Sequence, residues 1–409
     1  MIEISKAQRI IGRETGLLGV EKIELASAIG RILRENIIAD TDLPPFNRSQ
    51  MDGFAVLAAD TTDAPVMLKI IGESAAGKGW HKVMKRGEAV RIMTGAPVPK
   101  GADAVQKLEL TSEASGPGPT SGPVGPPDQI TIVQTVKPGE AIGRRGSEIN
   151  KGATIFKSGE VITENMIATL AAFGYARLKA GMQPRVAILG TGSEIVDVTK
   201  KPGRDQIRNS NSVMIDVLCR KFGAIATVLP IIRDEISDLI SEISKVAKNS
   251  DILVITGGVS VGKYDHAKTA LIELGAEIFF DKVRLKPGKP AVFARLGKTL
   301  LFGLPGNPVS AAVTFHVFVR KAIFTMQGAL KTDLKQGFAV LASAAKAARD
   351  RDTYLPSRLE SNKLGQLTAH PLKWQGSSDF IGFARADSLI FVPKGAIIKA
   401  GEVAEIAYL

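Results

Sequence analysis

The sequence predicts an α/β fold joined to β-rich domains, and three observations lead to this prediction. Between residues 184 and 330, strand-length apolar runs alternate with segments of helical apolar spacing. Such alternation is typical of a mostly parallel, doubly wound sheet with helices on both faces. Residues 54–138 read instead as short strands between glycine and proline turns. Residues 331–409 return to short strands and turns, which predicts a small C-terminal β-domain.

The individual elements follow from local patterns. Pro44 and Pro45 forbid a helix at the start of residues 41–58, so this segment should open extended. A Gly/Pro/Ser tract at 115–127 predicts an exposed loop without chemistry. The apolar patterns then predict strands at 186–189, 226–232, 252–256 and 299–304, and helices at 164–173, 211–222, 235–248, 268–274 and 309–326.

Composition limits the class of partner. The net charge of +12 favours an anionic partner, although a solvated basic surface explains it equally well. Aromatic residues make up only 5% and no basic run interleaves with them, which argues against nucleic acid. The single cysteine, Cys219, excludes an intramolecular disulfide, and its helical setting predicts a packed core thiol. The N-terminus lacks a signal-peptide core and no uninterrupted apolar run approaches about 20 residues, so we expect a soluble, cytoplasmic protein without a membrane partner.

Two apolar strands run into loops that suit an anion. The strand at 252–256 leads into Gly257-Gly258-Val259-Ser260-Val261-Gly262, whose glycines allow positive φ and a close backbone approach. The strand at 299–304 leads into Pro305-Gly306-Asn307-Pro308, where Asn307 suits a helix N-cap and Pro308 the first helical position. Ligands bind beyond the carboxyl ends of strands in open α/β sheets, so we expect both loops at one rim.

Charged side chains accompany these loops. Lys282, Lys286 and Lys289 lie between them and suit a phosphate or a tetrahedral oxyanion, although a solvated strand end explains them equally well. Asp265 follows Gly262 by three residues, which favours a phosphate and a metal over a plain tight turn.

Other polar positions carry weaker signals. Glu194, in Thr191-Gly192-Ser193-Glu194, belongs to a turn that could present backbone N–H groups to an anion. Asp52 reads as a turn aspartate and Asp234 as a helix N-cap, and the local sequence alone does not choose between these roles and a functional one. Histidines 81, 266, 316 and 370 show no ligand spacing, and His316 lies on an apolar helix that predicts packing.

Several long motifs, in one order along nearly all 409 residues, resemble those of the molybdopterin molybdenumtransferases, a family that includes the gephyrin E-domain. The motifs occupy residues 43–56, 71–77, 91–105, 206–212, 257–265, 286–290 and 303–310. The resemblance implies an elongated four-domain subunit in a homodimer, with the second domain of one subunit facing the α/β domain of the other. The implied domains are 1–47 with 139–182 (an extended α/β linker domain), 48–138 (β-rich), 183–330 (α/β, molybdopterin-binding) and 331–409 (C-terminal β).

The resemblance also implies a reaction. Adenylated molybdopterin and molybdate would be converted to molybdenum cofactor with release of AMP, assisted by a divalent metal, usually Mg²⁺. The molybdopterin adenylyltransferase would be a possible partner. Catalytic roles are implied for Asp52, Thr94, Glu194, Asp234 and Asp265, of which the three aspartates would bind the metal. Substrate-binding roles are implied for Gly257, Gly258, Ser260, Gly262, Lys282, Lys286, Pro305, Pro308 and Ser377.

Two positions depart from the family pattern. Gly146-Ser147-Glu148-Ile149 stands where Gly-Glu-Asp-Ile is frequent, and Pro356 stands at a frequent arginine position, where Arg358 is the expected substitute. Two other functions remain open at this point. The molybdopterin adenylyltransferase has a similar α/β domain, but its glycine turn typically reads Gly-Gly-Thr-Gly and it lacks the flanking domains. A non-catalytic scaffold of the gephyrin type is the second, although Asp52 and Asp265 disfavour pure scaffolding.

Overall fold

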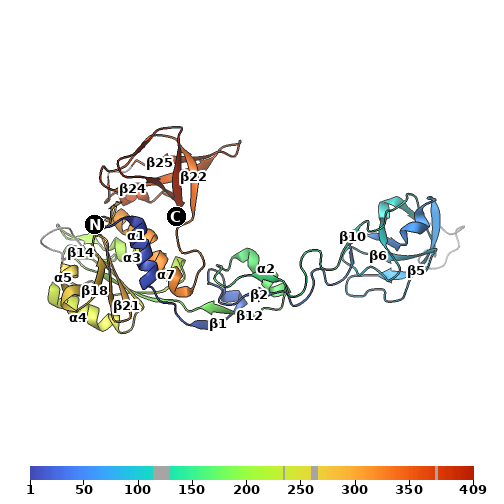
Figure 1. The fold of residues 1–409 in the computed structure, drawn as a ribbon, viewed down its shortest axis with the longest axis horizontal. Coiled ribbons are helices and arrows are strands. Elements are labelled where there is room, and N and C mark those ends of the chain that lie inside the picture. Colours follow the sequence, from blue (N-terminus) through green and yellow to red (C-terminus); the bar gives the residue numbers. More distant parts are fainter. Residues whose placement is uncertain (114–128, 234, 259–265, 374–375) are drawn as a thin grey trace. The chain divides into compact units, whose positions relative to one another are not determined.

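A computed structural model of the chain describes residues 1–113, 129–233, 235–258, 266–373 and 376–409 (Figure 1). The chain forms two compact units, which are described separately. The larger unit comprises residues 1–35 and 157–409, and the smaller comprises residues 36–156. The predicted loop at 115–127 lies outside the described residues.

A six-stranded sheet forms the centre of the larger unit, with the strand order β16-β13-β17-β21-β20-β18. The first four strands of this order are parallel to one another. Strand β20 pairs with β21 in the antiparallel direction, and β18 pairs with β20 in the antiparallel direction. Because neighbouring parallel strands end at the same edge, the loops after β13, β17 and β21 share one rim. The bounds are β13 (Arg185–Gly190), β16 (Ile225–Val228), β17 (Ile252–Thr256), β18 (Glu277–Phe280), β20 (Val292–Leu296) and β21 (Thr299–Leu304).

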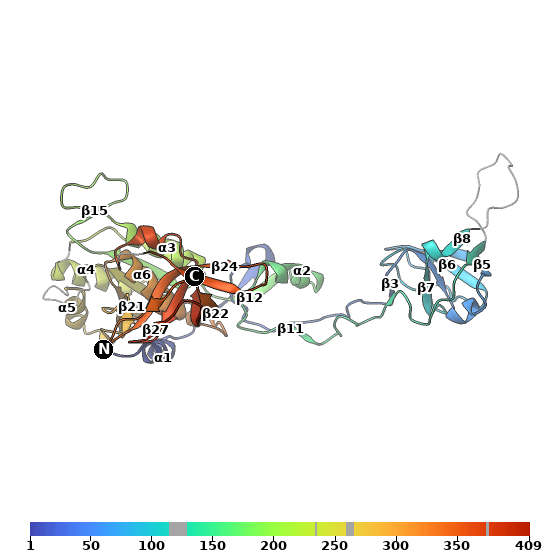
Figure 2. The ribbon, with the colours of Figure 1, turned by 90° about the horizontal axis from the view of Figure 1, so that it is seen from above.

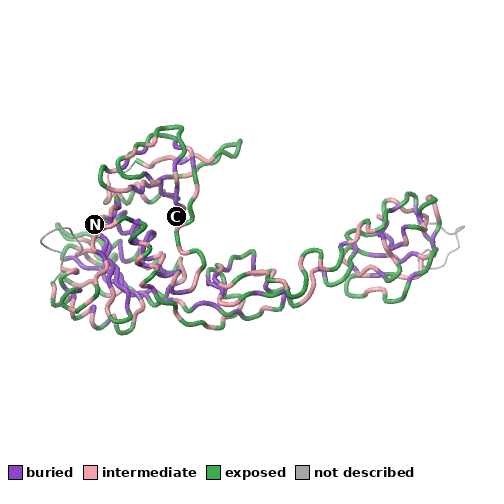
Figure 3. Tube along the Cα trace, viewed as in Figure 1, coloured by how far each residue is buried: buried purple, intermediate pink, exposed green. Residues whose placement is uncertain are grey.

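Helices cover both faces of this sheet, as predicted. Alternate side chains of a strand point to opposite faces. On β17, Val254 packs in the cluster that includes α1 (Ile4–Glu14) and α3 (Ser210–Lys221). Its neighbour Leu253 packs in the cluster with α4 (Ile236–Ala247) and α5 (His266–Glu273). The central strands β17 and β21 are correspondingly buried along their whole length (Figure 3).

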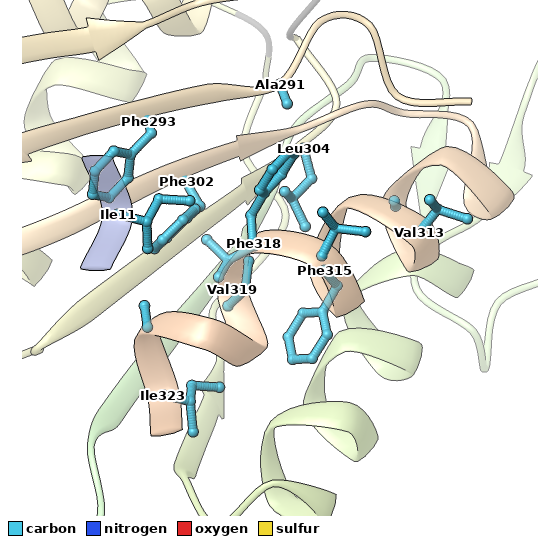
Figure 4. Packing of buried hydrophobic residues seen from close by; sticks show 14 of the residues in the cluster. Ile11, Ala291, Phe293, Phe302, Leu304, Val313, Phe315, Phe318, Val319 and Ile323 are labelled. Carbon is cyan, nitrogen blue, oxygen red and sulfur yellow. The ribbon is translucent and has the colours of Figure 1, made fainter. Parts of the chain in front are cut away.

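Aromatic side chains fill the first of these two layers. The ring centroids of Phe293 and Phe302 lie 4.8 Å apart, and Phe318 joins them from the helical layer (Figure 4). Cys219 of α3 is fully buried in the same cluster, and burial raises the pKa of its thiol to about 12. The prediction that Cys219 is a packed core residue is therefore confirmed.

The helical segment predicted at 309–326 contains an irregularity. It divides into α6 (Pro308–Thr314), the π-helical segment η4 (Phe315–Val319) and α7 (Arg320–Gln327). In the described part of the chain, this 20-residue stretch is the one helix long and apolar enough to cross a membrane, but 83% of it is buried in the protein. Core packing explains its apolar character.

His316, at the centre of this helix, is 5% exposed and packs edge-on against Phe222. Burial, together with the charges of Lys221 and Arg320, lowers the pKa of His316 from 6.5 to about 3. The side chain is therefore neutral at physiological pH, and the prediction that it is packed is confirmed.

Replacing His316 by leucine should flatten the dependence of stability on acid. The folded-state pKa lies below the unfolded value, so the unfolded chain binds more protons as the pH falls below 6.5. The wild type should therefore lose up to roughly 1.4 kcal/mol of unfolding free energy per pH unit in this window, a loss that His316→Leu lacks. Urea unfolding at pH 7 and pH 5 measures both slopes, and equal losses in the two proteins would contradict the assignment.

A second six-stranded sheet, with the order β19-β24-β25-β22-β28-β26, occupies the C-terminal part of the larger unit. An additional pairing of β24 with β26 closes five of these strands into a barrel, which the sequence did not predict. The sixth strand, β19, belongs to the loop before β20 and pairs in parallel with β24. The bounds are β19 (Leu285–Lys286), β22 (Gln336–Leu341), β24 (Asp352–Ser361), β25 (Leu367–Pro371), β26 (Ser388–Val392) and β28 (Val403–Tyr408).

Smaller elements complete the larger unit. The strand β1 (Val20–Glu24) pairs with β12 (Arg177–Gly181) beside α2 (Glu164–Ala172), close to the helix predicted at 164–173. The remaining pairs are β14 (Ile195–Val196) with β15 (Ile207–Arg208) and β23 (Ala345–Lys346) with β27 (Ile397–Ile398). A short helix, α8 (Phe380–Phe383), follows the barrel strand β25.

The smaller unit is built on a third six-stranded sheet, with the order β7-β4-β6-β5-β9-β8 (Figure 2). Phe54 is fully buried in its core. The bounds are β4 (Gly53–Val56), β5 (Val66–Ser74), β6 (Glu88–Ile92), β7 (Ala104–Lys107), β8 (Thr111–Glu113) and β9 (Gln129–Ile132). Two short pairs, β2 (Ile37–Ile38) with β11 (Thr154–Phe156) and β3 (Arg48–Ser49) with β10 (Ile142–Gly143), accompany it. The prediction of an α/β fold joined to β-rich domains is confirmed.

Candidate functional site

The loops after β13 and β17 touch at the carboxyl edge of the central sheet. Gly257 follows β17 with a φ of +90°, and a Cβ there would lie 2.0 Å from the backbone oxygen of Thr191. Only glycine fits this approach. The backbone N–H of Thr191 also donates to the oxygen of Thr256 at 3.0 Å, which fixes one loop against the other.

A pocket of about 110 Å³ opens between these loops and the loop after β21, and we call it the glycine-loop pocket. It contains three of the predicted residues, Glu194, Gly257 and Pro308. Its lining is otherwise rich in amides, hydroxyls and backbone groups. The lining residues are Thr191, Glu194, Ile195, Ile207, Arg208, Asn209, Ser210, Asn211, Thr256, Gly257, Gly306, Asn307 and Pro308.

A second pocket of about 360 Å³ lies beside the first, and we call it the cation pocket. It brings together the predicted Lys286, Pro305 and Ser377. Three cationic side chains line it and none of its lining residues is acidic, so it favours an anion. Arg351 also pairs through its Nε with the carboxylate of Asp350 at 3.3 Å. The lining residues are Lys286, Pro287, Gly288, Lys289, Pro290, Pro305, Asn307, Ser310, Arg351, Gly376 and Ser377.

Asn307 belongs to the lining of both pockets. It occupies the N-cap position of α6, and Pro308 is the first helical residue, as predicted. The Asn307 side chain, however, makes no capping hydrogen bond to the helix. Its Nδ2 instead donates to the Oγ of Ser377 at 2.8 Å, and the backbone N–H of Val309 donates to the Ser377 oxygen at 3.1 Å. These two bonds join the C-terminal barrel to the central sheet at the site.

Arg351 is the cation that the sequence interpretation missed. The sequence suggested Arg358 as a substitute for the arginine replaced by Pro356, but Arg358 is exposed and does not line the cation pocket, and Pro356 is buried. Arg351 reaches the pocket because β19 pairs with β24, which sets Leu285 opposite Asp352 and Lys286 opposite Thr353. Arg351, which directly precedes β24, therefore lines the same pocket as Lys286. A local sequence pattern does not predict the pairing of β19 with β24, because these strands lie far apart in the sequence.

Two further predicted residues lie near the rim but outside these linings. Lys282 lines neither pocket, and its backbone oxygen accepts from the N–H of Ile2 at 3.0 Å. Gly258 directly follows Gly257 and has a φ of +60°.

Asp52 and Thr94 meet in the smaller unit. Asp52 precedes β4 and Thr94 follows β6, and the antiparallel register sets Gly53 opposite Ile92. Both the backbone N–H and the hydroxyl of Thr94 donate to the Oδ1 of Asp52, at 2.7 and 2.9 Å. These bonds, the backbone one first, lower the pKa of Asp52, so it stays ionised. The Asp52 carboxylate is therefore fixed in position by Thr94, beyond its place in a turn.

Glu148, the acidic residue that departs from the family pattern, also has a partner in this unit. Its Oε1 accepts from the Nη2 of Arg48 at 2.9 Å. Both side chains are substantially exposed, so the pair contributes little to stability.

Four predicted residues, Asp234, Ser260, Gly262 and Asp265, lie outside the described residues. Glu235 occupies the N-cap position of α4, which begins at Ile236. Within the described ranges, no three acidic, histidine or cysteine side chains are placed to hold a metal ion together. The described carboxylates alone therefore do not form a metal site.

Comparisons with known proteins cover nearly the whole chain. Residues 2–174 match the model of the MoeA N-terminal region (domain I and II), residues 187–325 that of a probable molybdopterin binding domain, and residues 339–409 that of the MoeA C-terminal region (domain IV). The chain is 33% identical over 404 residues to a molybdopterin molybdenumtransferase of Staphylococcus aureus strain COL, covering 98% of this chain and 93% of that protein. A Staphylococcus epidermidis protein of the same name is 31% identical over 389 residues, covering 94% and 90%.

Solved structures agree with this result. The crystal structure of a molybdopterin biosynthesis MoeA protein from Pyrococcus horikoshii OT3 superposes with a TM-score of 0.83 at 26% identity, with both chains fully covered.

Proposed function

The chain belongs to the MoeA family of molybdopterin molybdenumtransferases, and from this premise we propose that it inserts molybdenum from molybdate into adenylated molybdopterin and releases AMP. The main structural support for this proposal is a pair of adjacent pockets. Two pockets suited to anions lie side by side at the carboxyl edge of the central sheet and share Asn307 as a wall. A reaction between two anionic substrates needs this arrangement.

The cation pocket suits molybdate. Molybdate is a tetrahedral dianion, and Lys286, Lys289 and Arg351 supply compensating charge. The guanidinium of Arg351 offers a rigid fork of donors, whereas the lysines act as mobile point charges. The hydroxyl of Ser377 adds a neutral hydrogen-bonding group. The hydrogen bond from Asn307 fixes the position of this hydroxyl.

The glycine-loop pocket suits the pyrophosphate of adenylated molybdopterin. Gly257 and Gly306 bring backbone close to the pocket, and backbone N–H groups bind phosphate oxygens without adding charge. Glu194 lines the same pocket, and we propose that it orients a water or substrate hydroxyl there. We propose substrate-binding roles for Gly258, Ser260, Gly262 and Lys282 as well.

We also propose a divalent cation, Mg²⁺, held by Asp52, Asp234 and Asp265. Carboxylate oxygens are the ligands that Mg²⁺ prefers, and such an ion would neutralise negative charge on the pyrophosphate. The ionised state of Asp52 supports its part in this set.

We further propose that the enzyme acts as a cytoplasmic homodimer of four-domain subunits. Asp52 and Thr94 belong to the unit of residues 36–156, while both pockets belong to the other unit. A dimer in which Asp52 of one subunit serves the pockets of its partner would complete the site. The molybdopterin adenylyltransferase, as the source of the adenylated substrate, is the proposed physiological partner.

AMP release tests the proposed function against its rivals. The purified protein should release AMP from adenylated molybdopterin, and molybdate with Mg²⁺ should accelerate the release. A protein that instead consumes ATP and molybdopterin would be the adenylyltransferase. A protein active in neither assay would be a scaffold.

A further inference from the structure

Asn211 makes two hydrogen bonds that join two loops of the rim. It lies on α3, is 8% exposed and lines the glycine-loop pocket. Its Nδ2 donates to the Oγ1 of Thr256 at 2.9 Å and to the backbone oxygen of Gly306 at 2.7 Å. Thr256 ends β17 and Gly306 follows β21, so one amide group ties together the loops of two neighbouring strands.

The amide of Asn211 is satisfied at its nitrogen but not, within the described part of the chain, at its oxygen. The Oδ1 of Asn211 is buried and has no hydrogen-bond partner among the described residues. A buried carbonyl oxygen without a partner is unfavourable, and an apolar side chain of the same size would avoid this cost. The two bonds made by the Nδ2 are therefore the feature that distinguishes asparagine from leucine here.

One of those bonds holds Gly306, the neighbour of the residue that lines both pockets. Gly306 directly precedes Asn307, which lines both pockets and donates to Ser377 of the cation pocket. Asn211 itself does not line the cation pocket. The Gly306-Asn307 turn is thus the hydrogen-bonded connection from Asn211 to the cation pocket.

We propose that Asn211 is a positioning residue that fixes the Gly306-Asn307 turn, so that oxyanion binding in the cation pocket depends on a side chain outside it. The inference rests on the proposed function, because it takes molybdate as the ligand of that pocket. If Asn211 only contacted the pterin nucleotide, molybdate binding alone would be insensitive to its replacement.

The test measures the binding of molybdate alone by isothermal titration calorimetry. Asn211→Leu keeps the number and branching of the side-chain heavy atoms and the neutral charge but removes both bonds. We expect its Kd for molybdate to rise by about fivefold or more, which corresponds to the loss of roughly one net hydrogen bond. An unchanged Kd in a folded Asn211→Leu protein would overturn the proposal.

Two variants control this measurement. Arg220→Ala, on the same helix as Asn211, removes the bonds of Arg220 to Asp216 and to the backbone oxygen of Ala226 in β16. Arg220 lines neither pocket, so this variant should leave molybdate affinity unchanged. Thr256→Val removes one of the two partners of Asn211 but keeps the Gly306 bond, so its Kd should change less than that of Asn211→Leu. A larger effect of Thr256→Val, or an equal effect of Arg220→Ala, would contradict a role through Gly306.

Hydrogen exchange separates this inference from the proposed function. If Asn211 fixes the turn, the amides of residues 306 and 307 should exchange faster in Asn211→Leu than in the wild type, without any substrate present. Unchanged exchange at these amides would overturn the inference. Wild-type protein that binds no molybdate would contradict the proposed function, and the exchange result would still stand. If Asn211→Leu does not fold, Asn211→Ser tests the same contacts, because its shorter side chain cannot reach both partners.

Discussion

The double variant Lys286→Ala with Arg351→Ala will lose molybdate binding while the chain stays folded. Both side chains line the cation pocket, one from β19 and the other from just before β24. A hydrogen bond to a charged group contributes about 1.5–3 kcal/mol, so each substitution should weaken binding by about tenfold or more, and the pair by about a hundredfold or more. Calorimetric titration with molybdate measures the loss directly.

A matched control separates the pocket from the overall positive charge. Lys363→Ala removes an exposed lysine that lines neither pocket and should bind molybdate like the wild type. The single variants show whether the guanidinium or the ammonium dominates. Full affinity in the double variant would place molybdate elsewhere on the protein.

The second large effect concerns Asp52→Asn. The amide oxygen of asparagine can still accept both bonds from Thr94, so the local fold should persist. The variant loses the negative charge that we propose for metal binding, and losing a charged metal ligand costs several kcal/mol of transition-state stabilisation. AMP release at saturating Mg²⁺ should therefore fall by about a hundredfold or more. Near-normal release would remove Asp52 from the proposed catalytic set.

Mixing two inactive variants tests whether a site is shared between subunits. If Asp52 of one subunit serves the pockets of the other, a dimer of one Asp52→Asn subunit and one subunit with Lys286→Ala and Arg351→Ala contains one intact site. Random reassociation should then recover about a quarter of wild-type activity. No recovery, with mixed dimers demonstrated by mass spectrometry, would mean that each site lies within one subunit.

Local patterns predicted the elements that position the rim. The apolar runs at 252–256 and 299–304 coincide with β17 and β21, because strands buried on both faces are apolar along their length. The strand predicted at 226–232 is shorter in the structure, where β16 spans Ile225–Val228. The antiparallel strands β18 and β20, of which β18 forms an edge of the sheet, were not predicted, and neither was the closure of the C-terminal barrel. Barrel closure depends on the pairing of β24 with β26, two segments distant in the sequence, which periodicity does not encode.

The same limit applies to the site. Lys286, Pro305 and Ser377 were predicted from motifs and do line one pocket. Arg351 was missed because only the pairing of β19 with β24 brings it there. The N-cap preference of Asn307 predicted its position but not its contact with Ser377, which belongs to a segment distant in the sequence.

Reconstitution of a cofactor-free molybdoenzyme tests the central claim most directly. The purified protein would be incubated with adenylated molybdopterin, molybdate and Mg²⁺, and the mixture would then be added to the cofactor-free enzyme. We predict that molybdenum enters that enzyme and restores its activity, in proportion to the AMP released and only when molybdate is present. AMP release without recovered molybdoenzyme activity, or recovery that does not require this protein, would contradict the assignment.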